Sequence, residues 1–155
     1  MTLSKSRDAV IDLLRCYASA VDSRDWQGVR NCYFADAVDD HGVVVGDRDV
    51  IVKYFEKALI NFENTMHLVG EPKITDLETN IFDVLTPCIA LHLARSGSQV
   101  RNLIISALYR DRVENRNGTY AIAQRKVILQ DAVEFERDST DWKFMNLFLN
   151  VKTSL

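Results

Sequence analysis

The chain has 155 residues, of which 47% are hydrophobic and 26% are charged. This length and composition are those of a globular protein with a buried core, not of a disordered or fibrous chain, so we expect residues 1–155 to form one domain. The formal net charge of -3 lacks the basic excess of a phosphate-binding surface, which argues against nucleic acid as a partner.

The cysteines and the apolar runs bear on where the protein works. Cys16, Cys32 and Cys88 are odd in number and widely spaced, so neither a disulfide framework nor a zinc knuckle is indicated. The polar N-terminus has no signal-peptide pattern, and no apolar stretch reaches membrane length. We therefore expect a cytoplasmic protein that makes no membrane contact.

The first half of the chain carries the 3.6-residue periodicity of helices. Three segments space their apolar residues in this way: residues 6–21, 25–33 and 50–62. A residue that can cap the helix stands at or before the start of each one: Ser4 or Ser6, Asp25, and Asp47 or Asp49. Between the second and third helices, residues 34–36 look irregular, and residues 37–45 predict a short hairpin that turns at Gly42.

From residue 66 the periodicity changes to that of strands. Four long runs rich in β-branched residues follow one another: residues 66–77, 81–95, 100–113 and 120–135. The last two separators contain Gly97 and Gly118, as hairpin turns require. Pro72 and Pro87 fall within the runs and predict bulges or edge positions. The second half is therefore predicted to be a curled antiparallel meander, whose concave face the helices cover around an internal pocket.

The C-terminal residues 142–155 contain a further apolar set: Phe144, Met145, Leu147, Phe148 and Val151. This set predicts either a docked helix or a segment exchanged at a subunit contact. The pattern leaves both alternatives open.

Three histidines are the main candidates for chemistry. Strand alternation places His92 on one face with Cys88 and Ala90, whose small side chains leave room beside the imidazole. His67 begins the first long strand, directly after the apolar third helix. His41 lies in the short hairpin next to two carboxylates.

Asp22 ends the first helix, where the helix macrodipole disfavours an anion that has no partner. A carboxylate that hydrogen-bonds an imidazole fixes its tautomer and raises its basicity, which general-base catalysis at neutral pH requires. The alternative is structural: Asp22 caps the turn after it, and each histidine is a satisfied core or surface group. A metal site built from Asp22 and the three histidines lacks any His-x-His or Glu-x-x-His spacing, so we expect no metal.

Several short motifs resemble one known family in their order and spacing. They are residues 17–26, the Asp39-Asp40-His41-Gly42 turn with Gly46, residues 66–70, and residues 109–112 before Asn117-Gly118. Together they resemble the SnoaL-like branch of the NTF2-like superfamily, which includes scytalone dehydratase. The resemblance implies a cone-shaped α+β fold of the NTF2-like or cystatin-like kind, with N-terminal helices packed on a curved antiparallel sheet. It also implies an oligomer, and we expect a homodimer or a homotrimer.

By this resemblance, Asp22 corresponds to a catalytic aspartate and His67 to a general-base histidine of scytalone dehydratase. Three positions depart from that enzyme. Val21 and His41 stand where it has two tyrosines, and Asn102 stands where it has a second catalytic histidine. These departures put its particular substrate and mechanism in doubt for this chain.

Other side chains are candidates for supporting roles. His92 can act as the second imidazole of the pocket. Four residues are candidates for contacting a substrate: Tyr17, Tyr54, Asn102 and Tyr109, although each tyrosine is more often a core aromatic. Arg125 either points inward to an acidic group or closes the sheet edge, and we expect its role to be structural.

The leading hypothesis is a cofactor-independent lyase or isomerase of secondary metabolism. It would act as a dehydratase, double-bond isomerase or cyclase on a small, partly apolar, carbonyl-bearing molecule such as a polyketide, aromatic or terpenoid intermediate. In it, His67 removes a proton next to the carbonyl, Asp22 orients the imidazole, and His41 or a tyrosine supports the enolate.

Two alternatives stay open at this point. One is a non-catalytic protein that binds a hydrophobic ligand or serves as an assembly subunit, which predicts outward-facing histidines. The other is a metal-free small subunit of a ring-hydroxylating oxygenase. Convergence of Asp22, His67 and His92 on one closed cavity would favour the enzyme.

Overall fold

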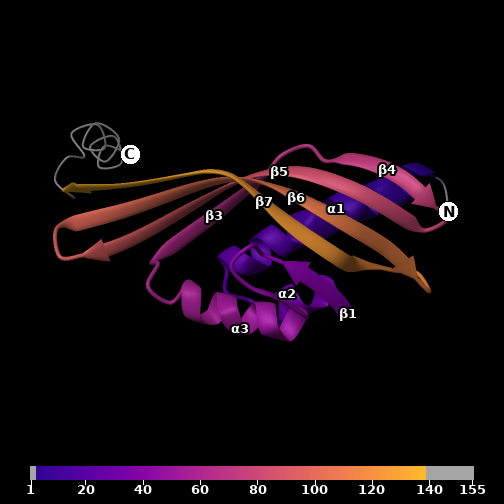
Figure 1. The fold of residues 1–155 in the computed structure, drawn as a ribbon, viewed down its shortest axis with the longest axis horizontal. Helices are drawn as coiled ribbons and strands as arrows, with labels where there is room; N and C mark the ends of the chain where they lie inside the picture. Colours follow the sequence, from indigo (N-terminus) through magenta and orange to yellow (C-terminus); the bar gives the residue numbers. More distant parts are fainter. Residues whose placement is uncertain (1–2, 139–155) are drawn as a thin grey trace, which may run out of the picture.

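The helices of the computed structural model, which describes residues 3–138, lie on one face of a long curved sheet (Figure 1). In chain order the elements are α1 (Leu3–Asp22), α2 (Trp26–Asn31), β1 (Tyr33–Asp40), β2 (Val45–Gly46), α3 (Arg48–Ala58), β3 (Asn64–Val69), β4 (Lys73–Glu78), β5 (Ile81–Ser96), β6 (Gln99–Arg116) and β7 (Thr119–Asp138). The predicted α+β class, with helices first and a curved sheet after them, is confirmed.

Aspartate caps fix where two of the helices begin. The Asp25 side chain accepts a hydrogen bond from the backbone N–H of Gly28 at 2.8 Å. Asp47 accepts from the N–H groups of Asp49 and Val50 at 2.9 and 3.0 Å. These bonds satisfy backbone donors that a helix leaves unpaired in its first turn. Both caps are among those the sequence predicts.

Within residues 3–138, seven strands form one mixed sheet. Six of them follow the order β2-β1-β7-β6-β5-β3, and β4 pairs with β5 on the same edge as β3. The β5, β6 and β7 strands form the predicted antiparallel meander. Asn117 and Gly118 both have positive φ, 55° and 91°, as a two-residue hairpin turn between twisted strands requires. The sheet is not purely antiparallel, however, because β1 pairs with β7 in parallel.

Two further predicted elements differ from the structure. Residues 33–36, expected to end a helix and then become irregular, belong to β1, because α2 stops at Asn31. The expected strand over residues 66–77 is two strands, β3 and β4, separated at Gly70-Glu71-Pro72.

Pro87 lies opposite this break, in the middle of β5. Its carbonyl accepts a hydrogen bond from the Gly70 N–H at 2.8 Å. In an antiparallel pair the N–H and C=O of one residue point to the same neighbouring strand. The missing N–H of Pro87 therefore faces the gap between β3 and β4, which is locally an edge position, as the sequence predicts for a strand proline.

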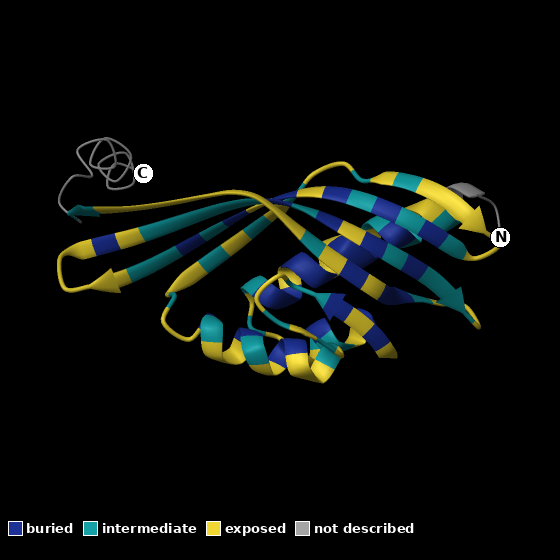
Figure 2. Cartoon of the chain, in the orientation of Figure 1, coloured by how far each residue is buried: buried dark blue, intermediate teal, exposed yellow. Residues whose placement is uncertain are grey.

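The core lies where α1 and α3 cover the sheet, and Figure 2 shows the buried residues concentrated there. Val10 of α1, Ile51 of α3 and Ile122 of β7 are completely buried. Toward the β5–β6 turn and the end of β7, the strands extend past the helices and are more exposed. No helix in the described part of the chain is long and apolar enough to cross a membrane. The prediction for residues 142–155 lies outside the described residues.

Candidate active site

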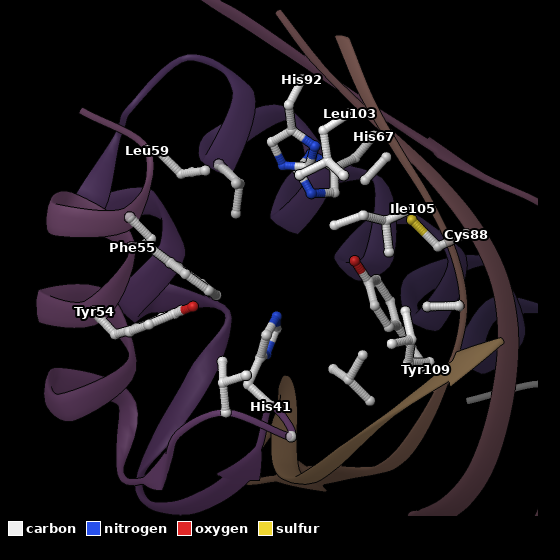
Figure 3. Close-up of a pocket in the computed structure, with 18 of the residues that line it drawn as sticks. His41, Tyr54, Phe55, Leu59, His67, Cys88, His92, Leu103, Ile105 and Tyr109 are labelled. Carbon is white, nitrogen blue, oxygen red and sulfur yellow. The ribbon is translucent and has the colours of Figure 1, made fainter. Parts of the chain in front are cut away.

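A cavity of about 540 Å³ lies between α3 and the inner face of the sheet (Figure 3). It is lined by Tyr17, Val21, His41, Gly42, Val43, Tyr54, Phe55, Ala58, Leu59, Phe62, His67, Cys88, Ala90, His92, Leu103, Ile105, Ala107, Tyr109, Val127 and Leu129. This volume is typical of small-molecule sites. The walls are mostly apolar, and their polar groups come from histidines and tyrosines.

Asp22 and His67 form a hydrogen-bonded pair in which His67 lines this cavity and Asp22 lies behind it, outside the lining. The Nδ1 atom of His67 lies 2.6 Å from Oδ1 of Asp22, and the backbone N–H of His67 donates to Oδ2 at 2.7 Å. The end of α1 supplies the aspartate and β3 supplies the histidine. Because the carboxylate engages Nδ1, Nε2 is the ring nitrogen left for a ligand.

Two residues behind this pair hold the Asp22 carboxylate. Thr65 donates its hydroxyl to Oδ1 of Asp22 at 3.0 Å and accepts a hydrogen bond from Arg24 at 2.7 Å. Burial opposes ionisation of Asp22, but hydrogen bonds from the side chain and backbone of His67 outweigh it, with Thr65 adding to them, so the pKa of Asp22 is lowered. Asp22 is therefore a carboxylate at neutral pH, which explains an anion at a helix C-terminus.

His92 stands beside His67, with 5.8 Å between the ring centroids, and its ring also packs 5.0 Å from that of Phe62. Burial lowers the pKa of His92, and the nearby His67 lowers it further. Its Nδ1 has no hydrogen-bond partner within residues 3–138. His92 therefore presents a neutral imidazole, and it shares the cavity with Cys88 and Ala90 as strand alternation predicts.

His41 reaches the cavity from the opposite side to His67 and His92, as Figure 3 shows. It lies in the turn between β1 and β2, and its ring meets Phe55 of α3 edge-on at 4.9 Å. Its Nδ1 lies 3.1 Å from Oδ1 of Asp39, whose side chain is completely buried. Tyr33 donates its hydroxyl to the other oxygen of Asp39 at 2.7 Å. The site therefore contains a second histidine–aspartate pair.

Arg125 points into the core beneath this second pair. Its Nε and Nη2 donate to the two oxygens of Asp111 at 2.7 and 2.6 Å, and both side chains are completely buried. The guanidinium lies 4.1 Å from the ring centroid of Tyr17 and 4.5 Å from that of Tyr109. It also donates to the hydroxyl of Tyr33 at 3.3 Å. Of the two orientations considered for Arg125, the structure shows the inward one.

The expected substrate-contacting residues divide into two groups. Tyr17, Tyr54 and Tyr109 line the cavity. Burial raises the pKa of Tyr17 and Tyr109, so both keep their hydroxyl protons. Asn102 does not line this cavity. Its neighbour Leu103 does, and alternation along β6 turns Asn102 to the other face of the sheet, which corrects its expected place in the pocket.

Several polar residues of the site were not among the residues expected there: Arg24, Tyr33, Asp39, Thr65 and Asp111. A signal exists for two of them. Asp111 alternates with the core residues Tyr109 and Val113, and Asp39 is two residues from the buried Ala37. A charge at a core position of a strand requires a partner, so it marks a buried polar network.

The chain matches the model of the SnoaL-like domain over residues 3–126. It therefore belongs to the SnoaL-like family, within the NTF2-like superfamily. No curated protein matches its sequence significantly. No group of three or more histidines, cysteines or acidic residues in the described part of the chain is arranged to hold a metal ion.

Solved structures share the fold at low sequence identity. Hexachlorocyclohexane dehydrochlorinase LinA-type3 from Novosphingobium barchaimii is 16% identical, with a TM-score of 0.75 over 84% of this chain and 90% of that one. A candidate scytalone dehydratase from Novosphingobium aromaticivorans is 16% identical, with a TM-score of 0.73 over 83% and 86%. A Nostoc punctiforme protein with a cystatin-like fold is 15% identical, with a TM-score of 0.64 over 79% and 89%.

Proposed function

We propose that the protein is a cofactor-independent lyase or isomerase that acts on a small, partly apolar, carbonyl-bearing molecule. The observation that carries this proposal is the 2.6 Å hydrogen bond between Asp22 and His67, with His67 opening into the apolar cavity. The two neighbours named above as a dehydrochlorinase and a candidate dehydratase are both named for eliminations. An elimination begins, like a double-bond migration or an enolate cyclisation, with removal of a proton from carbon.

In the proposed reaction, His67 is the general base. Its Nε2 takes the proton next to the substrate carbonyl, and the Asp22 carboxylate stabilises the imidazolium that forms. The apolar walls exclude water, so the charges that develop are poorly screened and the fixed polar groups act strongly on them. The electrons of the broken C–H bond then expel a leaving group, move a double bond or attack an electrophilic carbon of the same molecule.

The geometry favours this function over the non-catalytic alternative. A simple binder of hydrophobic ligands predicts histidines turned away from the pocket. Instead, three imidazoles line the cavity, and two of them are held by buried or half-buried carboxylates. Holding polar groups in an apolar cavity costs free energy that a purely apolar pocket avoids.

Turnover of a panel of aromatic, polyketide-like and terpenoid β-hydroxy ketones tests the proposal. Once a substrate is found, we expect His67→Gln to lower kcat by about 10²- to 10⁴-fold, the usual contribution of a general base. Asp22→Asn should also lower kcat, because the carboxylate no longer stabilises the imidazolium. Full turnover in both variants would refute the assignment of His67 as the base.

A matched control uses the other face of the same strand. Met66→Leu changes the exposed residue next to His67 and leaves the cavity lining unaltered. This variant should retain wild-type kcat. Circular dichroism of each variant, which reports the fold, then separates lost chemistry from lost structure.

A further inference from the structure

The face of the sheet turned away from the helices carries an apolar strip. Strand alternation turns the residues that line the cavity inward and their neighbours along each strand outward. On this outer face, one row of directly opposed residues crosses four strands: Met66 of β3, Leu91 of β5, Ile104 of β6 and Val133 of β7. The helices among residues 3–138 all lie on the other face, so none of them covers this row (Figure 1).

A second row widens the strip toward the turn between β5 and β6. It consists of Asn64, Leu93, Asn102 and Phe135, and neither row contains a charged side chain. Met66, Val133 and Phe135 keep 52%, 49% and 44% of their surface exposed. A groove of about 550 Å³ runs over the two rows and is lined by residues of all four strands. A contiguous exposed apolar surface of this kind marks an interaction site.

The chain continues beyond β7 from the end of this strip. Gln99 and Asp138 form the last pair of the sheet, next to the turn between β5 and β6. The row that ends at Phe135 lies only roughly 10 Å back along β7, at about 3.3 Å per residue. Residues 139–143 can span roughly 17 Å when extended, which is enough to reverse direction and return over the strip. The residues from 144 onward can therefore reach it.

The sequence beyond this linker matches the strip in polarity and in length. Residues 144–151 read Phe-Met-Asn-Leu-Phe-Leu-Asn-Val and contain no charge. Apolar residues recur in this run at spacings of three and four, which is the pattern of one helix face. Eight residues span about 12 Å as a helix. Four strands spaced about 4.8 Å apart span about 14 Å, so the run is long enough to cross the strip.

Attachment to the same chain favours this run over a second copy as the occupant. A short linker gives the run an effective concentration in the millimolar range at the strip of its own chain. A second copy has to compete from its concentration in free solution. Packing the run on the strip also removes two apolar surfaces from water at once, which the hydrophobic effect favours.

We propose that the apolar strip is the docking site of the chain's own C-terminal segment, with residues 144–151 packed over the rows that contain Met66 and Phe135. Of the two alternatives that the sequence leaves open, a docked segment and an exchanged one, the proposal commits to the docked segment. It does not depend on the function proposed for the cavity, because the strip and the cavity lie on opposite faces of the sheet.

Photo-cross-linking in the full-length protein tests the proposal. Benzoylphenylalanine in place of Phe148 keeps an aromatic ring at this position and bonds on irradiation to groups that touch it. We expect cross-links to residues of the strip, such as Ile104 or Phe135, in a product with the mass of one chain under denaturing conditions. A product with the mass of two chains would place the segment on a neighbouring copy and overturn the proposal. Cross-links outside the strip, or none, would overturn it as well.

A charge placed on the strip tests the contact from the other side. Phe135→Asp should lower the yield of the single-chain product roughly tenfold or more, because a carboxylate buried in an apolar contact is strongly disfavoured. Gln124→Glu is the control, since it adds the same charge to an exposed position of β7 outside the strip, and it should leave the yield unchanged. Equal yields in the two variants would contradict docking at the strip.

A charge placed on the segment should uncover the strip. Phe148→Asp disfavours docking, so binding of the dye ANS, which reports exposed apolar surface, should rise severalfold over the wild-type protein. Asn146→Asp adds the same charge to a polar position of the same run and should leave dye binding unchanged. Wild-type dye binding in Phe148→Asp would overturn the proposal. Circular dichroism of each variant shows that the sheet is intact.

Light scattering distinguishes the remaining occupant, the sheet face of a second copy. In that case Phe135→Asp should lower the molar mass in solution, and benzoylphenylalanine at position 148 should give no product on the strip. This combination would overturn docking of the C-terminal segment. If the segment docks on its own chain, the single-chain product should form with the same yield over a tenfold range of protein concentration, since the contact is intramolecular.

Discussion

The two histidine–aspartate pairs, His67 with Asp22 and His41 with Asp39, differ in how far their carboxylates are exposed to water. Asp22 keeps 23% of its side-chain surface exposed and is held by a threonine and an arginine near the surface. Asp39 is completely buried and depends on a tyrosine in front of a buried arginine. A histidine is therefore held by a partly exposed carboxylate on one side of the cavity and by a completely buried one on the other.

The largest effect should come from the buried ion pair of Asp111 and Arg125, which lies beneath the His41–Asp39 pair. Asp111→Asn leaves the Arg125 guanidinium uncompensated in the core, and breaking a buried ion pair in this way typically costs about 3–5 kcal/mol of unfolding free energy. Urea denaturation measures the loss. The exposed pair of Asp83 and Arg110, 3.2 Å apart, is the control, and Asp83→Asn should cost at most about 1 kcal/mol. Equal losses of unfolding free energy in the two variants would contradict the distinction between a buried ion pair and an exposed one.

A smaller effect is expected at Thr65, which donates to the partly exposed carboxylate of Asp22. Thr65→Val keeps the β-branched shape that suits β3 but removes the hydroxyl that donates to Asp22. A lost hydrogen bond to a charged group is worth about 1.5–3 kcal/mol, so kcat should fall roughly tenfold or somewhat more. Thr75→Val, on the exposed part of β4, should leave kcat unchanged. If both variants kept wild-type kcat, the hydrogen bonds from Arg24 through Thr65 to Asp22 would not contribute to positioning His67.

The smallest effect concerns His92, which stands next to His67. Because burial lowers its pKa in the folded protein, the unfolded chain takes up this proton first as the pH falls below about 6.5. Stability should therefore decline from that pH down to the folded pKa of His92, by at most about 1.4 kcal/mol per pH unit. His92→Gln should flatten this part of the curve of unfolding free energy against pH.

The contribution of Asp22 falls in a different pH window. Its pKa is lowered by folding, so its stabilisation is present above the ordinary value of 3.8 and is lost only as the pH falls through the folded value. As the pH falls, the His92 window therefore opens at about 6.5 and the Asp22 window only below 3.8. Parallel curves for the wild-type protein and His92→Gln between pH 5 and 6.5 would show that His92 is not desolvated in the folded protein.

Local signals in the sequence were enough for much of the fold. The Asp47 cap, the Asn117-Gly118 turn and the inward face of His92 each depend on a few neighbouring residues, so propensity and alternation predict them. The break at Gly70 was missed because residues 66–77 carry one continuous strand-like pattern. The parallel pairing of β1 with β7 was missed as well, since it joins residues more than 80 positions apart.

The site shows the same division between local and distant information. Asp22 and His67 are 45 residues apart, and only the resemblance to a known family suggested that they meet. The same resemblance suggested that Asn102 lies in the pocket, which alternation along β6 corrects. The Arg125 to Asp111 pair could be suspected from charges at core positions, but its link to Tyr33 and Asp39 depends on how β1 crosses to β7.

The interrupted strand opposite Pro87 also bears on how the protein avoids unwanted association. An unbroken edge over residues 64–78 would offer a long row of free backbone groups, which is a template for aggregation through strand addition. Instead, β3 and β4 present two six-residue edges separated by Gly70-Glu71-Pro72, and Pro72 has no N–H to give. The interruption thus shortens the row of free backbone groups that this side of the long sheet offers to the strands of other chains.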